Sequence, residues 1–286
     1  MSFSFRTYIS IVGLLLSQVL NACAQQTSEP PGSLPVDVPI LGTELRQLKS
    51  AETGRDYDIY IRLPEEYAQD QNGKYPVLYV LDGQWDFKLL DSIYGGLHYD
   101  GFVPEMIIVG ITYSGVKPDY ESLRAMDYTP AHDSFLPGSG DAPRFLAFLK
   151  EELFPFIEAS YPANPSQRVL MGSSFGGTFT LYAMFSEPGL FSGYVAASPA
   201  VPYGGRFAFK QEAEYASSHQ DLPVRLFLSV GGSESLRLPV EEFMQVLGER
   251  GYPGLEMETL TIEGEGHASN KPEGYNRGLR FIFQDE

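Results

Sequence analysis

The sequence predicts an α/β fold with a mostly parallel central sheet. Three observations predict it. Residues 43–67 alternate in the manner of two strands, with a turn at Thr53 and Gly54. Further along, uninterrupted apolar runs of strand length alternate with amphipathic runs of helical period. Finally, a cluster of small residues at 172–177 joins one apolar run to the next helix-like run, as a tight strand-to-helix turn requires.

Each later element is justified by its own pattern. The run "YPVLYVLDG" at 75–83 is apolar almost throughout, which is typical of a strand buried on both faces. Similar runs predict strands at 106–113, 168–174, 192–200, 224–232 and 255–264. Helical period predicts helices within 142–161, 176–188, 239–251 and 274–283. The long connector 200–223 predicts a short helix and part of a pocket wall.

The N-terminal segment predicts export and not folded structure. Arg6 precedes an apolar stretch over residues 8–20, which is short for a membrane span and typical of a signal peptide. The stretch ends in Leu-Asn-Ala-Cys, which resembles a bacterial lipobox and makes Cys23, the single cysteine, the expected lipidation site. We therefore expect a signal peptide over 1–22, a lipidated tether over 23–42 and a folded domain over 43–286. Plain secretion with an incidental Cys23 is the alternative.

The charge of the chain limits its partners. The formal net charge is −17, so association with a nucleic acid, itself a polyanion, is not expected. The predicted location is the bacterial cell envelope, at the outer membrane or its periplasmic face, with membrane contact through the lipid alone. Oligomeric state and membrane leaflet are left open by the sequence.

The small-residue cluster predicts a nucleophilic serine. In "RVLMGSSFGG", Ser174 alone has glycine two residues away on both sides, which gives G-x-S-x-G between a strand and a helix. This context is that of a nucleophile elbow, in which a tight turn leaves no room for a Cβ at Gly172 and Gly176. The alternative is an ordinary strand-to-helix turn.

The partners of Ser174 are expected downstream of it. His267 follows the last predicted strand in a loop of small residues, where an imidazole can reach over the sheet and act as the general base. Glu234 lies in the loop after the preceding strand and is the predicted acid, with Glu241 and Glu242 as alternatives.

Two backbone N–H groups are needed for the oxyanion. One is expected from Phe175, and the other from Gln84 or, as the alternative, Gly83.

Several of these segments together resemble the "Putative esterase" family of α/β hydrolases. The segments are "YPVLYVLDGQWDF", "IIVGITY", "RAMDYTP", "RVLMGSSFGG" and "GEGHAS", and the resemblance covers about Thr43 to Phe283. It implies an α/β-hydrolase fold with helices on both faces of the sheet, and chemistry without a metal or an organic cofactor. It also implies the roles given above for Ser174, His267, Glu234, Gln84 and Phe175.

The substrate-binding residues follow from the same reading. Arg124, in "RAMDYTP", stands where relatives carry an arginine near the site, and either binds a substrate anion or pairs with Asp127. An aromatic binding surface is expected from Trp85, Tyr113, Tyr203 and Phe207.

The predicted function is that of a serine ester hydrolase working through an acyl-enzyme. Because a strongly acidic chain repels polyanions, a neutral ester is the predicted substrate, such as an acyl or cinnamoyl group on a carbohydrate. Two alternatives are a ferric-siderophore esterase and a non-catalytic surface lipoprotein that uses the fold for binding. Acyl transfer to an acceptor other than water is also left open.

Overall fold

The computed structural model describes residues 39–65 and 74–284. The chain divides into two compact units, Met1–Pro39 and Ile40–Glu286. The first unit, with the predicted signal peptide and Cys23, lies almost wholly outside the described residues. Every helix and strand named below belongs to the second unit. No helix in the described residues is long and apolar enough to cross a membrane.

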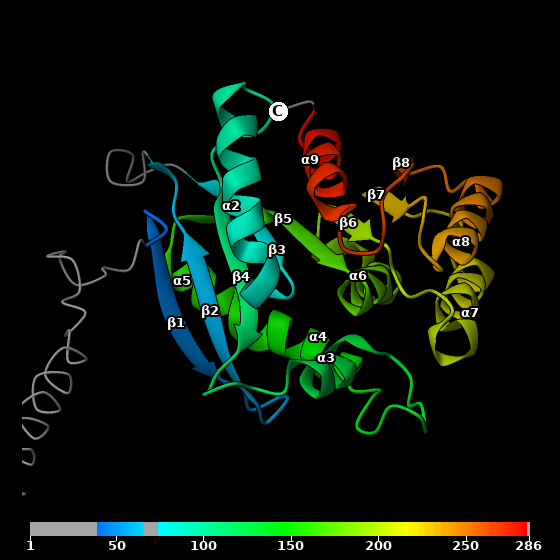
Figure 1. Ribbon diagram of the computed structural model, residues 1–286, viewed down its shortest axis with the longest axis horizontal. Coiled ribbons are helices and arrows are strands. Elements are labelled where there is room, and N and C mark those ends of the chain that lie inside the picture. Colours follow the sequence, from blue (N-terminus) through cyan, green and yellow to red (C-terminus); the bar gives the residue numbers. More distant parts are fainter. Residues whose placement is uncertain (1–38, 66–73, 285–286) are drawn as a thin grey trace, which may run out of the picture. The chain divides into compact units, whose positions relative to one another are not determined.

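The described residues form one eight-stranded sheet in the order β1-β2-β4-β3-β5-β6-β7-β8 (Figure 1). Strands β1 and β2 are antiparallel to each other, β2 is antiparallel to β4, and the remaining neighbours are parallel. The bounds are β1 Thr43–Lys49, β2 Asp56–Arg62, β3 Tyr75–Val80, β4 Ile107–Tyr113, β5 Ala163–Ser173, β6 Gly193–Ala197, β7 Val224–Gly231 and β8 Leu255–Ile262.

The helices connect these strands. Their bounds are α2 Gly83–Tyr99, α3 Tyr120–Tyr128, α4 Ala142–Ala147, α5 Phe154–Ser160, α6 Phe175–Ser186, α7 Tyr203–Ser218, α8 Arg237–Arg250 and α9 Lys271–Ile282. A π-helical turn, η2 Phe148–Leu153, joins α4 to α5, and a short 3-10 turn, η3 Pro188–Leu190, follows α6.

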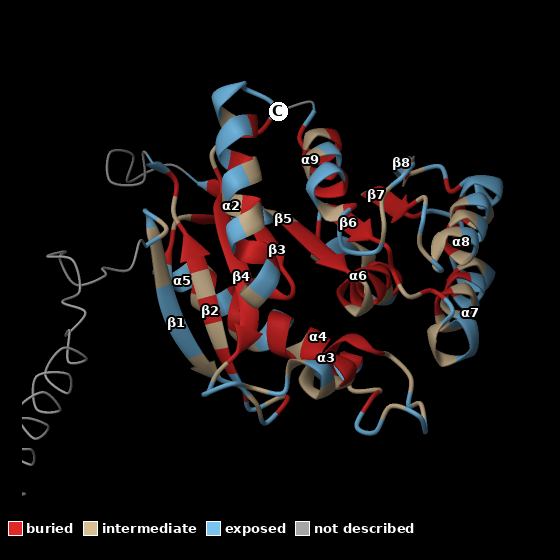
Figure 2. Ribbon diagram, in the orientation of Figure 1, coloured by how far each residue is buried: buried red, intermediate tan, exposed pale blue. Residues whose placement is uncertain are grey.

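Alternating strand residues bury two separate cores, one on each face of the sheet. On one face, Leu78 and Met171 pack with apolar residues of α2 and α9, such as Phe87 and Leu279. On the other face, Tyr79 and its neighbours pack with helices α4 to α8. Figure 2 shows the central strands as largely buried, whereas β1 and β8 at the sheet edges are largely exposed or intermediate. This two-faced arrangement confirms the predicted fold class.

The parallel register brings the carboxyl ends of four strands together. Ser173 of β5 pairs with Ala197 of β6, and Ala197 pairs in turn with Ser229 of β7. The last residue of β7, Gly231, pairs with Ile262, the last residue of β8. The segments that follow these strands therefore meet at one edge of the sheet, where parallel sheets carry their chemistry.

All the predicted strands are present, and the differences concern mainly helices. Strand β5 begins at Ala163, five residues before its predicted start. Helices α2 and α3 were not predicted. The helix in the connector 200–223, α7, is longer than expected and is interrupted near its start, where Gly204, Gly205 and Arg206 have non-helical backbone angles. The predicted helix over 142–161 is interrupted by the π-helical turn.

Candidate active site

Ser174 sits in a strained turn between β5 and α6. Its backbone angles are φ 60° and ψ −122°, a region that side chains with a Cβ seldom adopt. Its N–H donates to the carbonyl of Ala197 at 3.0 Å, and its carbonyl accepts from the N–H of Thr178 at 2.9 Å. Strain of this kind persists where the surroundings hold it in place, and it is frequent at functional residues. The geometry is that of the predicted elbow.

The two glycines that flank Ser174 differ in the space around them. A Cβ on Gly172 would lie 2.5 Å from the backbone carbon of Gly176. A Cβ on Gly176 would meet Asp82 and Leu81 at 3.4 Å, which is ordinary contact. The expectation that neither position has room for a Cβ therefore holds for Gly172 and is wrong for Gly176.

We expect Gly172→Ala to destabilise the protein much more than Gly176→Ala. Because the clash at Gly172 is with backbone, the turn itself must move, at a cost of about 2–3 kcal/mol, typical of overpacking. For a domain of this size that lowers Tm by roughly 4–12 °C. Thermal melts of both variants measure the difference. Equal losses in the two variants would contradict the asymmetry.

His267 and Glu234 are brought together from different loops. His267 follows β8, Glu234 follows β7, and the Nδ1 of His267 lies 2.5 Å from Oε2 of Glu234. The histidine side chain is 44% exposed, whereas that of Glu234 is 4% exposed. A carboxylate that accepts from Nδ1–H leaves Nε2 free to act as a base. Ser174 and His267 line the same cleft, which has a volume of about 270 Å³.

The alternative acids are engaged elsewhere. Glu241 accepts from Arg237 at 3.0 Å and from Thr261 at 2.9 Å. Glu242 accepts two hydrogen bonds from Arg206, at 2.9 and 2.7 Å. Of the three candidates, Glu234 is the one that faces His267.

Both expected oxyanion donors belong to the first turns of helices. Phe175 opens α6, and Gln84 is the second residue of α2. Amide groups at these positions have no intrahelical acceptor, and the helix dipole favours an anion there. Gly83 keeps this loop close to the sheet, because a Cβ on it would lie 2.9 Å from the backbone of Gly110. The Gln84 side chain accepts from the Thr112 hydroxyl at 2.7 Å, and this hydrogen bond ties the loop to strand β4.

Arg124 pairs with Asp82 and not with Asp127, so that expectation is wrong. Its guanidinium donates to both oxygens of the buried Asp82 carboxylate, at 2.5 and 2.9 Å. Asp127 instead binds Arg55 and Tyr57. Burial raises the pKa of Asp82, and Arg124 opposes the rise. Asp82 caps α2 with φ 57°, so this ion pair holds the residue from which the oxyanion loop starts.

A second ion pair near the cleft was not predicted. The Lys271 ammonium, at the start of α9, binds both oxygens of Asp86 at 2.8 and 3.1 Å. The Tyr275 hydroxyl donates to the same buried carboxylate at 2.6 Å. Lys271 lines the cleft beside Ser174. No sequence pattern pointed to it, because Asp86 and Lys271 are 185 residues apart in the chain.

The predicted aromatic surface is only partly present. Trp85 is exposed, lines the cleft, and has the Arg124 guanidinium 5.1 Å from its ring centre. Tyr203 packs its ring edge-on against Phe175, with centroids 5.4 Å apart. Tyr113 is 3% exposed and belongs to the core around β4, so the expectation that it binds substrate is wrong. Strand β4 is apolar throughout, so its sequence does not indicate whether Tyr113 faces the core or the cleft.

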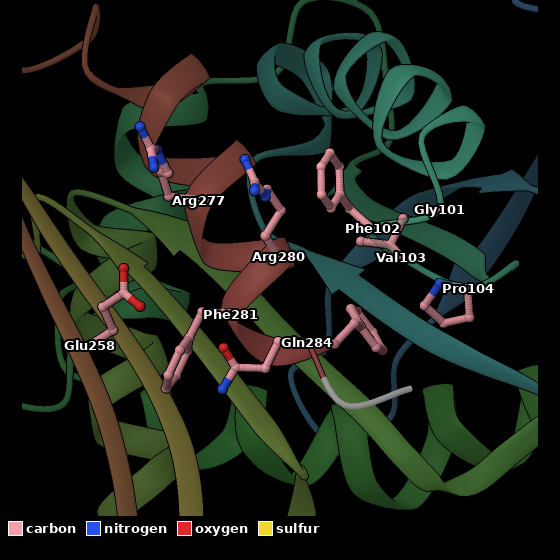
Figure 3. A pocket seen from close by; sticks show the side chains of 10 residues that line it. Gly101, Phe102, Val103, Pro104, Glu258, Arg277, Arg280, Phe281 and Gln284 are labelled. Atoms are coloured by element: carbon pink, nitrogen blue, oxygen red, sulfur yellow. The ribbon is translucent and has the colours of Figure 1, made fainter.

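A larger hollow of about 420 Å³ lies away from these residues (Figure 3). Its lining includes Phe102, which follows the C-terminal end of α2, and Arg280 near the C-terminal end of α9. The Arg280 guanidinium lies 4.0 Å from the centre of the Phe102 ring. Ser174, His267 and Glu234 are not among its lining residues, so the volume of a hollow does not identify the candidate active site in this protein.

The comparisons with known proteins agree with this geometry. The model of the family described as "Putative esterase" matches residues 50–253. The ferri-bacillibactin esterase of Bacillus subtilis (strain 168) is 29% identical over 285 residues, which cover 92% of this chain and 96% of that protein. A siderophore triacetylfusarinine C esterase of Aspergillus fumigatus is 29% identical over 59% of this chain and 60% of its own length.

Solved structures show the same architecture. The BES protein from Bacillus cereus superposes with a TM-score of 0.79 and 27% identity, covering 88% of this chain and 99% of that chain. A siderophore hydrolase from Aspergillus nidulans gives a TM-score of 0.78 at 23% identity, over 88% of this chain and 98% of that one, and supports the fold alone.

Proposed function

The chain belongs to the "Putative esterase" family and is a carboxylic ester hydrolase, and on that basis we propose that its substrates are the ester bonds of siderophores. The observation that carries this proposal is the similarity to a ferri-bacillibactin esterase along nearly the whole chain. The neutral carbohydrate ester predicted from net charge is the less well supported substrate.

In the proposed mechanism, Ser174 Oγ attacks the ester carbonyl while His267 Nε2 takes its proton. Glu234 stabilises the imidazolium through the Nδ1 hydrogen bond. The N–H groups of Phe175 and Gln84 receive the negative charge of the tetrahedral intermediate. His267 then protonates the departing alcohol, and a water molecule activated by the same histidine hydrolyses the acyl-enzyme.

The charge at the cleft is more nearly balanced than the net charge of −17 implies. Arg124 and Lys271 line the cleft with one carboxylate, that of Glu121. The carboxylates that balance the two cations belong to Asp82 and Asp86, which are buried behind them. Two cations beside the nucleophile make the approach of an anion less unfavourable than the net charge implies.

A substrate panel tests the proposal. Purified protein would be given ferri-bacillibactin, its iron-free form, a feruloylated oligosaccharide and an acetylated oligosaccharide, and kcat/KM compared. We expect the siderophore esters to be cleaved at least about tenfold more efficiently, equivalent to some 1.4 kcal/mol of transition-state binding. More efficient cleavage of a carbohydrate ester would overturn the proposal.

Lys271→Gln is expected to raise KM for the ferric siderophore by about three- to tenfold, because it removes one unit charge close to the bound anion. Hydrolysis of neutral p-nitrophenyl acetate should keep its KM. Lys150→Gln is the matched control, since Lys150 is an exposed cation that pairs with Glu187 and does not line the cleft. Equal increases in KM for the neutral and the anionic ester would count against an electrostatic role for Lys271.

We also propose that a lipid on Cys23 holds the enzyme at the cell envelope. The support is in the sequence: an apolar stretch over 8–20, a lipobox-like ending and a single cysteine. Cys23→Ser should move the protein from the membrane fraction to the soluble fraction and abolish incorporation of labelled palmitate. Membrane association that persists in this variant would contradict lipidation.

A further inference from the structure

The two oxygens of the Glu234 carboxylate have different partners. Oε2 accepts from His267 Nδ1, as described above. Oε1 points the other way and accepts from the Ser198 hydroxyl at 2.5 Å and from the Gly231 N–H at 2.7 Å. With Oε1 held by these two donors and, at 3.4 Å, by the Nδ2 of Asn270, rotation of the carboxylate is restricted and Oε2 stays directed at the imidazole. Glu234 is therefore oriented chiefly by two groups, the Ser198 hydroxyl and the Gly231 N–H, that have no role in the mechanism proposed above.

Ser198 occupies a backbone conformation that does not suit a serine. It follows β6 directly, is fully buried, and has φ 45°. Glycine adopts such angles without strain, so local conformation alone favours glycine here. The hydroxyl of Ser198 is what a glycine would lack, and that hydroxyl is the group bound to Glu234. The strained residue Ser198 is therefore also the residue that contacts the candidate acid.

Asn270 completes the arrangement from the other side. It is fully buried at the start of α9, and its Nδ2 donates to the Ser198 oxygen at 3.0 Å. The same nitrogen lies 2.8 Å from the carbonyl of Gly266 and 2.9 Å from that of His267. Oxygens on several sides of this atom fix it as the nitrogen of the amide. Asn270 therefore contacts both the loop that carries His267 and the serine that holds Glu234.

The amide oxygen of Asn270 has no hydrogen-bond partner within the described part of the chain. A buried oxygen without a donor is unfavourable, so a merely space-filling residue at this position would be better apolar. The side-chain nitrogen explains why an asparagine is found here, because both of its N–H groups have acceptors nearby.

We infer that Ser198 and Asn270 are positioning residues that hold the Glu234 carboxylate in line with His267, extending the triad to a hydrogen-bonded chain of Asn270, Ser198, Glu234 and His267. The inference rests on the proposed role of these residues in ester hydrolysis, and not on the siderophore as substrate.

The test uses the full-length protein and the neutral probe p-nitrophenyl acetate. Ser198→Ala removes a hydrogen bond to a charged group, so kcat should fall by about 10- to 100-fold while KM stays unchanged. The low-field proton resonance of His267 Nδ1–H should shift upfield or broaden. Ser229→Ala is the matched control, because Ser229 is also fully buried next to this region and its hydroxyl has no partner in the described residues. It should keep kcat and the resonance.

Ser198→Gly separates positioning from stability. It removes the same hydroxyl but relieves the strain at φ 45°, so the variant should lose less stability than Ser198→Ala does. We expect it to lose kcat as Ser198→Ala does. If Ser198→Gly keeps normal kcat and an unchanged His267 resonance while Glu234→Gln loses activity, the inference is overturned and the triad stands. If Glu234→Gln is also normal, the proposed mechanism itself fails.

Discussion

Ser174→Ala is expected to lower kcat by about 10⁵- to 10⁶-fold, the scale seen when the nucleophile of a serine hydrolase is removed. Labelling by a fluorophosphonate probe should disappear with it, because the probe reacts with the serine oxygen. The melting temperature should stay the same or rise, since the substitution removes one oxygen from a strained residue and leaves its backbone bonds to Ala197 and Thr178 in place.

Ser173→Ala is the control for this variant. Ser173 is the last residue of β5 and is buried, so it precedes the turn and does not sit in it. It should keep substantial activity and full labelling. Loss of labelling in Ser173→Ala alone, or turnover retained in Ser174→Ala, would show that the nucleophile is assigned to the wrong serine. Absence of labelling in the native protein would favour the non-catalytic binding alternative.

Glu234→Gln is expected to lower kcat by about 10⁴-fold while the fold is preserved, by analogy with the carboxylate-to-amide substitution in the serine-protease triad. An amide can present its NH₂ to Nδ1 and so stabilise the wrong tautomer of His267, and it offers the imidazolium no charge. The kcat of purified variants on p-nitrophenyl acetate measures this, with circular dichroism to verify folding.

Glu241→Gln supplies the comparison for Glu234→Gln. Its carboxylate binds Arg237 and Thr261 at a distance from the imidazole, so activity should be close to native. Near-normal turnover in Glu234→Gln would indicate a working Ser–His pair without an acid.

The strands could be predicted because their signal is local. Five of them, β3 to β7, bury most of their residues, as the continuous apolar runs indicate. Helix α2 was not predicted, because two adjacent glycines and a buried charged residue, Asp86, obscure its helical pattern. Its acid is neutralised by Lys271, a residue 185 positions away, and no sequence pattern announces such a partner.

In the candidate site, too, some residues could be predicted from local sequence and others could not. Ser174, His267 and Glu234 are marked by small residues after strands and by their order along the chain, and the structure brings them to one edge of the sheet. The pairing of Arg124 with Asp82 depends on tertiary packing, and the sequence offered Asp127 instead as one of two alternative partners for Arg124. Net charge favoured a neutral ester over the siderophore ester proposed above, because net charge sums over the whole surface, whereas a substrate meets the potential of the cleft.

The Asp86–Lys271 ion pair also has a consequence for synthesis of the enzyme. The loop that carries the predicted oxyanion donor is made early, but the ammonium that ties its helix to the rest of the site lies near the C-terminus. A nascent chain therefore exposes Asp86 unpaired until α9 has emerged and docked. A polypeptide that stops before His267 also lacks the proposed general base, so it cannot cleave an ester by this mechanism, and hydrolytic activity reports that synthesis has passed this point.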